Sequence, residues 1–241
     1  MSQEAVLITT LSDGVLWLTL NRPKARNALN LELTRALASQ FARIDADEHV
    51  KVAVITGTDP AFCAGLDLND FSDAASPRHE VGAMINSVPL IRKPVIAAVN
   101  GAAMTGALEI ALGCDFIIAS EQAKFADTHT KIGALAGGGL TARLPYRVGS
   151  AWAKQLSFTS LPVDAATALR IGIVNEVKPH TELLPYVRTL AAAIAAQNPE
   201  LVNTVKRVID AGSYSTLADA IRIEREALAI RKSKGDASWK R

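Results

Sequence analysis

Residues 94–116 read PVIAAVNGAAMTGALEIALGCDF, and the rest of the chain is organised around this stretch. An apolar run of strand length leads through small residues into a helix-compatible segment that carries one carboxylate, Glu109. Such a strand, turn and helix leaves the first amide N–H groups of the helix available to an anion or a polarised carbonyl oxygen. If Thr105 caps the helix and Gly106 opens it, Glu109 lies one turn further on and on about the same face. The Gly106 N–H group and the Glu109 carboxylate would then contact the same small ligand. The alternative is that Gly106 permits close packing and Glu109 is paired within a core.

The whole chain has the composition of an ordinary globular protein. Its 241 residues are 49% hydrophobic and 21% charged, which suits one large domain or a domain with a helical appendage. A formal net charge of +2 gives no reason to expect nucleic acid or an anionic membrane as a partner. No apolar run reaches the length of a membrane span and the N-terminus lacks a signal pattern, so we expect a cytoplasmic protein. Cys63 and Cys114 lack metal-ligand spacing, and we expect two reduced thiols.

The segments before this stretch alternate between strand and helix patterns. Residues 5–11 and 15–20, separated by Ser-Asp-Gly, predict a β-hairpin. Apolar residues at helical spacing predict an amphipathic helix from Asn30 to about residue 45. The apolar run at 52–56 predicts a buried parallel strand. These repeated units favour an α/β architecture with a mainly parallel sheet.

The rest of the chain is predominantly helical. Residues 70–80 predict a loop or short helix over the site, residues 81–91 a helix, and residues 115–120 another strand. From about residue 141 onward helical patterns dominate, and the last of them cover 181–196, 199–211 and 217–230.

Other chemistries find little support in the sequence. The acidic cluster at 45–49 fits no common metal loop and indicates a solvated helix end. Cys63 has no histidine near it in sequence, which argues against a cysteine nucleophile. The glycine-dense segment 133–140 fits neither the P-loop nor the dinucleotide-binding pattern, and the chain has no G-x-S-x-G nucleophile elbow.

Four segments in order resemble the crotonase superfamily, also called the enoyl-CoA hydratase/isomerase family. They are Asn21-Arg22-Pro23 with Asn27-Ala28-Leu29; Ala61 to Leu68; Ala98-Val99-Asn100-Gly101 with Gly106-Ala107-Leu108-Glu109; and Ala123-Lys124-Phe125 with its downstream glycines. A later segment, Arg170 to Val174, extends the likeness, which spans about residues 5–180. The resemblance implies an α/β fold, a spiral of β-β-α turns over residues 1–180. A helical C-terminal oligomerisation region at 181–241 would follow, usually in a trimer or a dimer of trimers (a hexamer).

The resemblance also implies the ligand, a coenzyme A thioester, with no separate cofactor and no metal. An enolate formed from a thioester carries negative charge on its carbonyl oxygen, which two preorganised N–H groups can hold. By resemblance these are the backbone N–H groups of Leu66 and Gly106. The segments that hold coenzyme A in relatives match Arg22, Lys24, Ala25, Ala64, Asp67 and Leu68. Arg22 or Lys24 near the phosphates is one interpretation, and simple solvent exposure is the other.

Two residues are the predicted acid/base groups. Family hydratases commonly use two glutamates, and Glu109 matches the first. The second falls on His129, which is the main departure from the family pattern. An imidazole transfers protons near neutral pH, so His129 serves as the second acid/base, orients a ligand, or is structural. Asp127 is either its partner or its substitute.

Three functions remain open at this stage. The first is a lyase, an enoyl-CoA hydratase that adds water reversibly to a 2-enoyl-CoA in fatty acid metabolism. The second is an enoyl-CoA isomerase, which needs one proton-shuttling base, or another crotonase-type reaction of an acyl-CoA. The third is a non-catalytic acyl-CoA binding protein. The tail at 231–241 lacks the aromatic pattern that relatives often place against a neighbouring ligand, although its basic residues are candidates for phosphate contacts. Acyl-chain length does not follow from the sequence.

Overall fold

The computed structural model describes residues 4–73, 76–233 and 235. Within them the chain forms two compact units, Met1–Ala195 and Ala196–Arg241. The first unit holds both sheets and all the predicted site residues. Of the basic tail at 231–241, a candidate for phosphate contacts, residues 234 and 236–241 lie outside the described residues.

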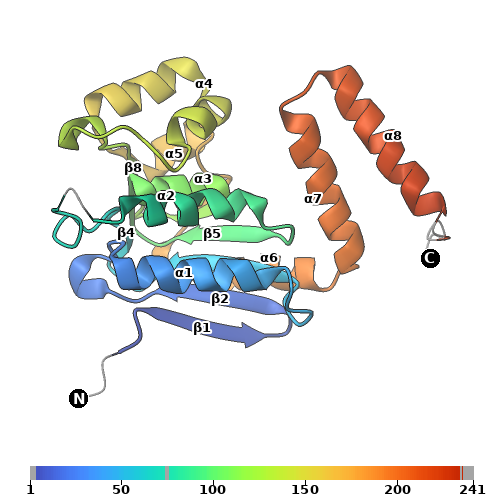
Figure 1. Ribbon diagram of the computed structural model, residues 1–241, viewed down its shortest axis with the longest axis horizontal. Helices are drawn as coiled ribbons and strands as arrows, with labels where there is room; N and C mark the ends of the chain where they lie inside the picture. The colour runs from blue at the N-terminus through green and yellow to red at the C-terminus, as the bar shows by residue number, and fades with distance from the viewer. Residues whose placement is uncertain (1–3, 74–75, 234, 236–241) are drawn as a thin grey trace. The chain divides into compact units, whose positions relative to one another are not determined.

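A six-stranded sheet forms the centre of the first unit (Figure 1). Its order is β1-β2-β3-β5-β7-β10, formed by Leu7–Ser12, Val15–Leu20, Val52–Gly57, Val95–Val99, Phe116–Ser120 and Glu176–Lys178. Only the β1–β2 pair is antiparallel, which confirms the predicted hairpin and the mainly parallel sheet. Strand β3 is buried at every position, because helices cover both faces of a parallel sheet.

A smaller sheet stands beside the large one. Its order is β4-β6-β8-β9, formed by Ala61–Cys63, Ala102–Met104, Lys124–Ala126 and Val163–Asp164. Strands β4, β6 and β8 follow directly after β3, β5 and β7 of the large sheet, and neighbouring members of each set pair in parallel. A helical segment follows each short strand. The predicted spiral of β-β-α turns is therefore confirmed.

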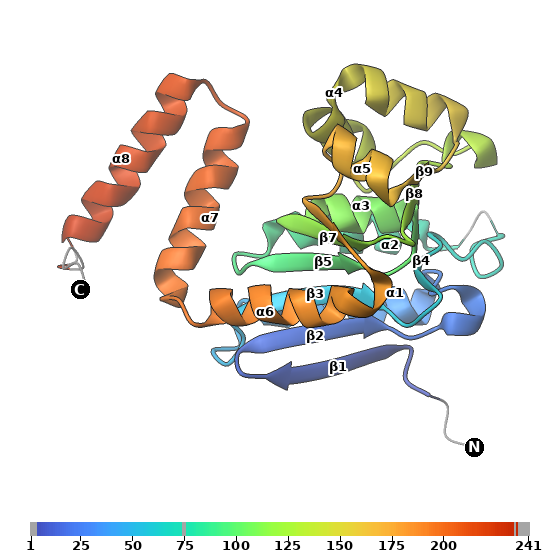
Figure 2. The ribbon, with the colours of Figure 1, turned by 180° about the vertical axis from the view of Figure 1, so that it is seen from behind.

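Helices cover the two faces of the large sheet. On one face lie α1 (Leu31–Ile44), α2 (Arg78–Ser87) and α3 (Gly106–Gly113). On the other face α6 (Leu183–Ala195) packs against β2, β3, β5 and β7 (Figure 2). The sequence grouped α6 with the C-terminal helices, whereas its apolar side covers the sheet. Short 3-10 turns, η1 to η4, occupy Pro23–Ala25, Val88–Leu90, Thr130–Ile132 and His180–Glu182.

The first helix shows how the sequence determines an element. The side chain of Asn30 accepts a hydrogen bond from the Leu33 amide at 2.9 Å and so caps α1. Its apolar residues recur every three or four positions, and they form a buried stripe against the sheet. This confirms the predicted amphipathic helix and its start.

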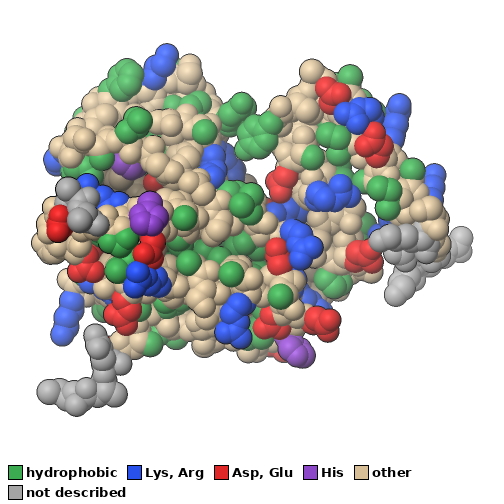
Figure 3. Space-filling model, in the orientation of Figure 1, with side chains coloured by type: hydrophobic (Ala, Val, Ile, Leu, Met, Phe, Trp, Pro, Cys, Tyr) green, Lys and Arg blue, Asp and Glu red, His purple; other side chains and the backbone are tan. Residues whose placement is uncertain are grey.

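Two further helices complete the first unit. Helix α4 (Leu140–Thr159) is interrupted at Gly149, where φ is 75° and ψ is 159°, and α5 covers Ala165–Ile171. Charged side chains of both signs are intermixed on the face shown in Figure 3, in keeping with the small net charge.

The second unit consists of α7 (Pro199–Ser213) and α8 (Leu217–Ser233), which pack against each other. Asn198 caps α7 by accepting from the Leu201 amide at 3.0 Å. Among the described residues of these two helices, Ala227 is the one buried residue. In the part of the chain that the structure describes, none of the helices is both long and apolar enough to cross a membrane.

Candidate active site

The two predicted oxyanion donors occupy equivalent places on neighbouring strands. Cys63 of β4 pairs with Ala103 of β6, and Leu66 and Gly106 each lie three residues further along. A Cβ atom on Gly65 would lie 2.8 Å from the Met104 carbonyl oxygen, so the two chains stay in close contact beyond the strand ends. The parallel pairing thus brings the predicted donors together.

The N–H group of Leu66 is directed away from Leu29, with which Leu66 forms a parallel β-bridge. Leu29 donates to the Gly65 carbonyl at 2.8 Å and accepts from the Asp67 amide at 3.0 Å. In a parallel bridge of this kind the intervening residue turns its own N–H to the other side. Gly106 opens α3, where the amide has no partner within the helix. Over the described residues, neither amide donates to another protein group.

Thr105 shapes the entrance of α3. It adopts φ 54° and ψ −109°, in the left-handed half of the φ range that is rare for a residue with a branched side chain. Its side chain makes no capping bond to the helix, contrary to the simplest expectation. Instead its hydroxyl pairs with that of Thr128, and the Thr128 amide donates to it at 3.2 Å. The turn before Gly106 is therefore fixed by contacts to the segment after β8.

Glu109 lies on α3 one turn after Gly106, and it is 2% exposed. Its Oε1 accepts from the Gly138 amide at 2.9 Å and from the Leu140 amide at 3.1 Å. Its Oε2 lies 4.0 Å from Nε2 of His129. One carboxylate oxygen is thus bound by backbone and the other faces the imidazole.

The His129 side chain is held by Asp127. Nδ1 lies 2.7 Å from the Asp127 carboxylate, which also accepts from the His129 amide at 3.1 Å. Because a carboxylate only accepts hydrogen bonds, Nδ1 carries a proton and Nε2 is presented to Glu109. Asp127 is therefore the partner of the imidazole in this structure.

The pKa values of this cluster are displaced for identifiable reasons. Burial raises the pKa of Glu109, against the opposing effects of the Leu140 amide and His129. Burial would lower the pKa of His129, but the Asp127 hydrogen bond and the Glu109 charge together raise it. Burial would likewise raise the pKa of Asp127, but its hydrogen bonds to His129 and Ser157 lower it. The cluster therefore favours a charged imidazole and a carboxyl that titrates above its usual range.

The segments expected to hold coenzyme A lie side by side. Arg22 forms a 2.9 Å ion pair with Asp67 and also donates to the Ala28 carbonyl oxygen. The Ala64 amide donates to the Arg26 carbonyl at 2.9 Å. The guanidinium of Arg22 is thus already engaged inside the protein, where it joins the two segments.

The other predicted contact residues differ in exposure. Lys24 is exposed, and so is Leu68, with 55% of its surface accessible. Ala25 and Ala64 are half-buried, whereas Asp67 is buried. Lys24 is consequently the basic side chain of this set that reaches solvent.

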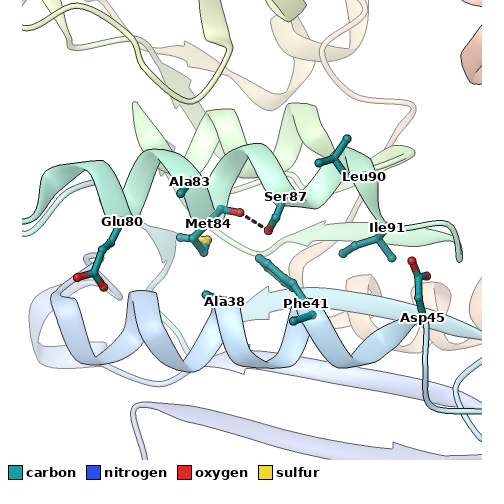
Figure 4. Close-up of a pocket in the computed structure, with 10 residues that line it drawn as sticks. Ala38, Phe41, Asp45, Glu80, Ala83, Met84, Ser87, Leu90 and Ile91 are labelled. Atoms are coloured by element: carbon teal, nitrogen blue, oxygen red, sulfur yellow. Dashed lines mark hydrogen bonds between the residues drawn. The ribbon is translucent and has the colours of Figure 1, made fainter.

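Two hollows lie away from the acid/base cluster. A groove of about 430 Å³ lies along the contact between α1 and α2 (Figure 4), and its apolar lining includes Phe41, Met84 and Ile91. A pocket of about 560 Å³ lies near the carboxyl ends of β2, β3 and β5, and its lining includes Trp17, Asp59 and His180. Neither lining includes Glu109 or His129.

The structure gives little support to a cysteine nucleophile or to a metal site. Burial raises the pKa of the Cys63 thiol to about 12, so it is a poor nucleophile. In the described ranges, no group of three or more His, Cys, Asp or Glu side chains is arranged to hold a metal ion.

The sequence interpretation missed three residues that shape this cluster. Thr128 fixes the α3 entrance, and Asn86 and Arg143 hold the glycine-rich loop whose amides bind Glu109. The tandem glycines at 137–139 were the available signal, because such a loop needs contacts that fix its amides.

Two neighbouring short strands that each end just before a predicted N–H donor, in a spiral of β-β-α turns, define a crotonase-type α/β fold. The chain matches the enoyl-CoA hydratase/isomerase family over residues 10–238. Probable enoyl-CoA hydratase 1, peroxisomal, of Arabidopsis thaliana is 35% identical, and the match covers 94% of this chain and 86% of that protein. The crotonyl-CoA hydratase of Syntrophomonas wolfei is 37% identical, with 88% and 84% covered.

Solved structures agree with these relatives. An enoyl-CoA hydratase from Bacillus anthracis aligns with a TM-score of 0.89 at 32% identity, covering 93% of this chain and 90% of that one. An enoyl-CoA hydratase from Mycobacterium avium aligns with a TM-score of 0.77 at 42% identity, covering 96% and 99%. This chain belongs to the enoyl-CoA hydratase/isomerase family.

Proposed function

We propose that the protein is an enoyl-CoA hydratase, a lyase that adds water reversibly to a 2-enoyl-CoA thioester. The observation that carries this proposal is the pairing of Glu109 with His129 across 4.0 Å beside the predicted donors Leu66 and Gly106. Hydratase names among relatives at 35% and 37% identity support the same reaction. Coenzyme A enters as part of the substrate, and the reaction needs no separate cofactor.

The two amide groups take the thioester carbonyl oxygen. As the double bond accepts a nucleophile at its β-carbon, electrons move to this oxygen and an enolate forms. Donors fixed by strand register and by a helix start stabilise that charge without rearranging. Leu66 and Gly106 act through their backbones, so their side chains are free to be apolar or absent.

Glu109 and His129 divide the proton transfers. Ionised Glu109 takes a proton from water as the water oxygen bonds to the β-carbon. Protonated His129 gives its Nε2 proton to the α-carbon, and the enolate returns to a thioester. One proton then passes from Glu109 to His129, which restores the starting state. The raised pKa of His129 favours the protonated imidazole, and the raised pKa of Glu109 makes its carboxylate a stronger base toward water.

Product analysis tests the proposal. The purified protein is incubated separately with a 2-enoyl-CoA and a 3-enoyl-CoA, and the products are separated by mass and retention time. Hydration predicts a 3-hydroxyacyl-CoA, 18 mass units heavier than the 2-enoyl-CoA, the mass of one water molecule. Conversion of 3-enoyl- to 2-enoyl-CoA without hydration would identify the isomerase instead. Tight binding of thioesters without turnover would identify a binding protein. A panel of chain lengths would define the acyl preference.

The loops at 22–28 and 64–68 are proposed to hold the coenzyme A moiety. Lys24 is the favoured phosphate contact because it is exposed, whereas Arg22 is engaged by Asp67. Ala25, Ala64, Asp67 and Leu68 complete the proposed set. Replacement of Lys24 by Ala should raise KM more than it lowers kcat, and an unchanged KM would remove this contact.

A homo-oligomer, trimer or hexamer, is the proposed assembly. Apolar side chains of α7 and α8 stand exposed in the single chain: Leu201, Val205, Ile209, Leu217, Ile221, Leu228 and Ile230. Such faces are typical of protein interfaces. Light scattering coupled to gel filtration measures the mass directly, and a monomer would contradict the proposal. The proposed domain roles are catalysis in 1–180 and assembly in 181–241, and within the latter region α7 and α8 carry the exposed apolar side chains.

A cytoplasmic location and a place in fatty acid metabolism complete the proposal. The two cysteines, Cys63 and Cys114, are buried thiols, which suits a reducing compartment. Subcellular fractionation tests the location.

A further inference from the structure

The glycine-rich loop between η3 and α4 supplies both amides that bind Glu109. Residues 133–137 of this loop are mostly exposed, whereas Gly138 and Leu140 are buried against the carboxylate. A Cβ atom on Gly138 would lie 2.7 Å from the Glu109 carboxylate oxygen, so the backbone approaches as closely as a glycine allows. Correct placement of Glu109 therefore depends on where this loop is held.

Two side chains from different helices hold the loop. Asn86 of α2 donates to the Gly137 carbonyl oxygen at 2.9 Å. Arg143 of α4 donates to the Gly138 carbonyl oxygen at 2.6 Å and to the Asn86 amide oxygen at 3.2 Å. Together they close a ring of hydrogen bonds around the loop. Neither side chain is bonded to Glu109 itself.

The planar guanidinium is suited to this task. One Arg143 nitrogen meets backbone and another meets Asn86, which fixes the side chain in two directions at once. The same guanidinium lies against Gly139, where a Cβ atom would approach it to within 2.6 Å. Gly139 also adopts φ 93°, a conformation that favours glycine. The loop sequence and the two side chains are thus fitted to each other.

We propose that Asn86 and Arg143 are positioning residues that orient the Glu109 carboxylate through the 137–140 backbone. The inference rests on the hydratase function proposed above. In this arrangement Oε1 stays bound to two amides, and Oε2 alone is directed to His129 and the substrate water. If the ring is lost, the loop moves and the carboxylate samples unproductive orientations, since small displacements of a catalytic group can cost up to about 100-fold in rate.

The charged surroundings of Glu109 determine the expected pH effect. From the segment after β8, His129 lowers its pKa and Asp127 raises it. From α2 the close neighbour of the Gly138 site is the apolar Ile85. Arg143 of α4 donates to the Gly138 carbonyl oxygen of the loop and to the side-chain amide oxygen of Asn86 on α2. The two loop amides lower the pKa of Glu109. Their loss therefore leaves the carboxyl protonated to a higher pH, and the acidic limb of the kcat profile moves upward.

The test compares Arg143→Lys and Asn86→Ala with wild-type protein. Lysine keeps the positive charge but lacks the forked guanidinium group. If only the charge of Arg143 mattered, Arg143→Lys would therefore keep the wild-type kcat. We expect kcat for a short 2-enoyl-CoA to fall about tenfold or more in both variants. KM should stay within about twofold, because no substrate contact is removed. The acidic limb of kcat should move to higher pH. Arg147→Lys, one turn along α4 and bonded to the Asp115 carbonyl oxygen, is the matched control.

Hydrogen exchange supplies a readout that does not need activity. We expect the peptide spanning 133–140 to exchange faster in both variants and unchanged in Arg147→Lys. If exchange and the pH limb both match wild type, the positioning role is wrong. A loss of thermal stability without either change would also overturn it. Wild-type protein that hydrates no thioester would refute the proposed function, and loop exchange would still decide whether the two residues hold the loop.

Discussion

The two halves of the candidate site are built in different ways. On one side, Gly106 and Glu109 lie on α3, whose eight residues are all buried. On the other side, Asp127 and His129 follow the three-residue strand β8 and lead into an exposed loop. The α3 backbone is fixed by the packing of a fully buried helix, whereas the Asp127 and His129 side chains are fixed by individual hydrogen bonds. We therefore expect changes on the α3 side to cause the largest losses of turnover. Changes on the β8 side are expected to have smaller effects on rate and on pH dependence.

The largest expected effect comes from the α3 side. Glu109→Gln keeps the shape of the side chain but removes the base, and turnover should fall by about 10³- to 10⁴-fold while acyl-CoA binding is preserved. Steady-state kinetics and calorimetric binding measure the two properties separately. Glu80→Gln, which replaces the half-buried ion-pair partner of Arg35 away from the acid/base cluster, is the control. Unchanged turnover would remove Glu109 from the mechanism.

Removal of the Gly106 N–H group should have the next largest effect. Gly106→Pro deletes the donor at the first position of a helix, where proline is otherwise tolerated. Loss of one oxyanion donor should lower kcat by about 100- to 1,000-fold. Gly106→Ala keeps the N–H, and its new methyl group would meet its nearest neighbours at 3.5 Å. Similar losses in both variants, with native circular dichroism, would argue against an oxyanion role.

His129 tests the contribution of the β8 side. His129→Ala should lower hydration by about 100-fold, at the lower end for a proton-transferring group, and should change binding much less. The exposed His79→Ala variant is the matched control. An equal loss of binding and turnover would indicate a ligand-orienting role. If neither changes, His129 is structural and the chemistry lies wholly on the α3 side.

Asp127→Asn should have the smallest effect on rate but a distinct effect on stability. The raised pKa of His129 stabilises the fold below its unfolded value of 6.5, and this stabilisation is lost as pH rises through the folded value. The lowered pKa of Asp127 stabilises the fold above its unfolded value of 3.8, and this is lost as pH falls through the folded value. The stability gap between wild type and variant should therefore be widest between these limits. Urea unfolding at pH 5.5 and 8.5 measures it, and a gap that is larger at pH 8.5 would contradict the ion pair.

The difference between the two sides also explains what the sequence could predict. The hairpin, α1 and the parallel sheet follow from apolar periodicity and caps, which are local signals. The placement of Glu109 one turn after Gly106 follows from helix geometry alone. The four sequence segments that resemble the crotonase superfamily then indicated the family and, with it, the spiral fold.

Contacts between distant segments leave no such local pattern. Asn86 reaches a loop 51 residues further along the chain, and Thr105 meets Thr128 across 23 residues. A single sequence shows each of these residues as an ordinary polar side chain. Similarly, the sequence indicated Arg22 as a candidate phosphate ligand, because its ion pair with Asp67 joins residues that are 45 positions apart in the chain.

The contact between Thr105 and Thr128 links two segments that recombination or protein engineering could separate. Because the Thr105 hydroxyl pairs with Thr128, the turn that aims the Gly106 amide is completed by a residue next to His129. The two stretches therefore form one module, and recombination that separates them would break the hydroxyl pair. A chimera built from a relative should carry segments 94–116 and 124–140 together, so that the donor of one parent is never combined with the acid/base loop of another.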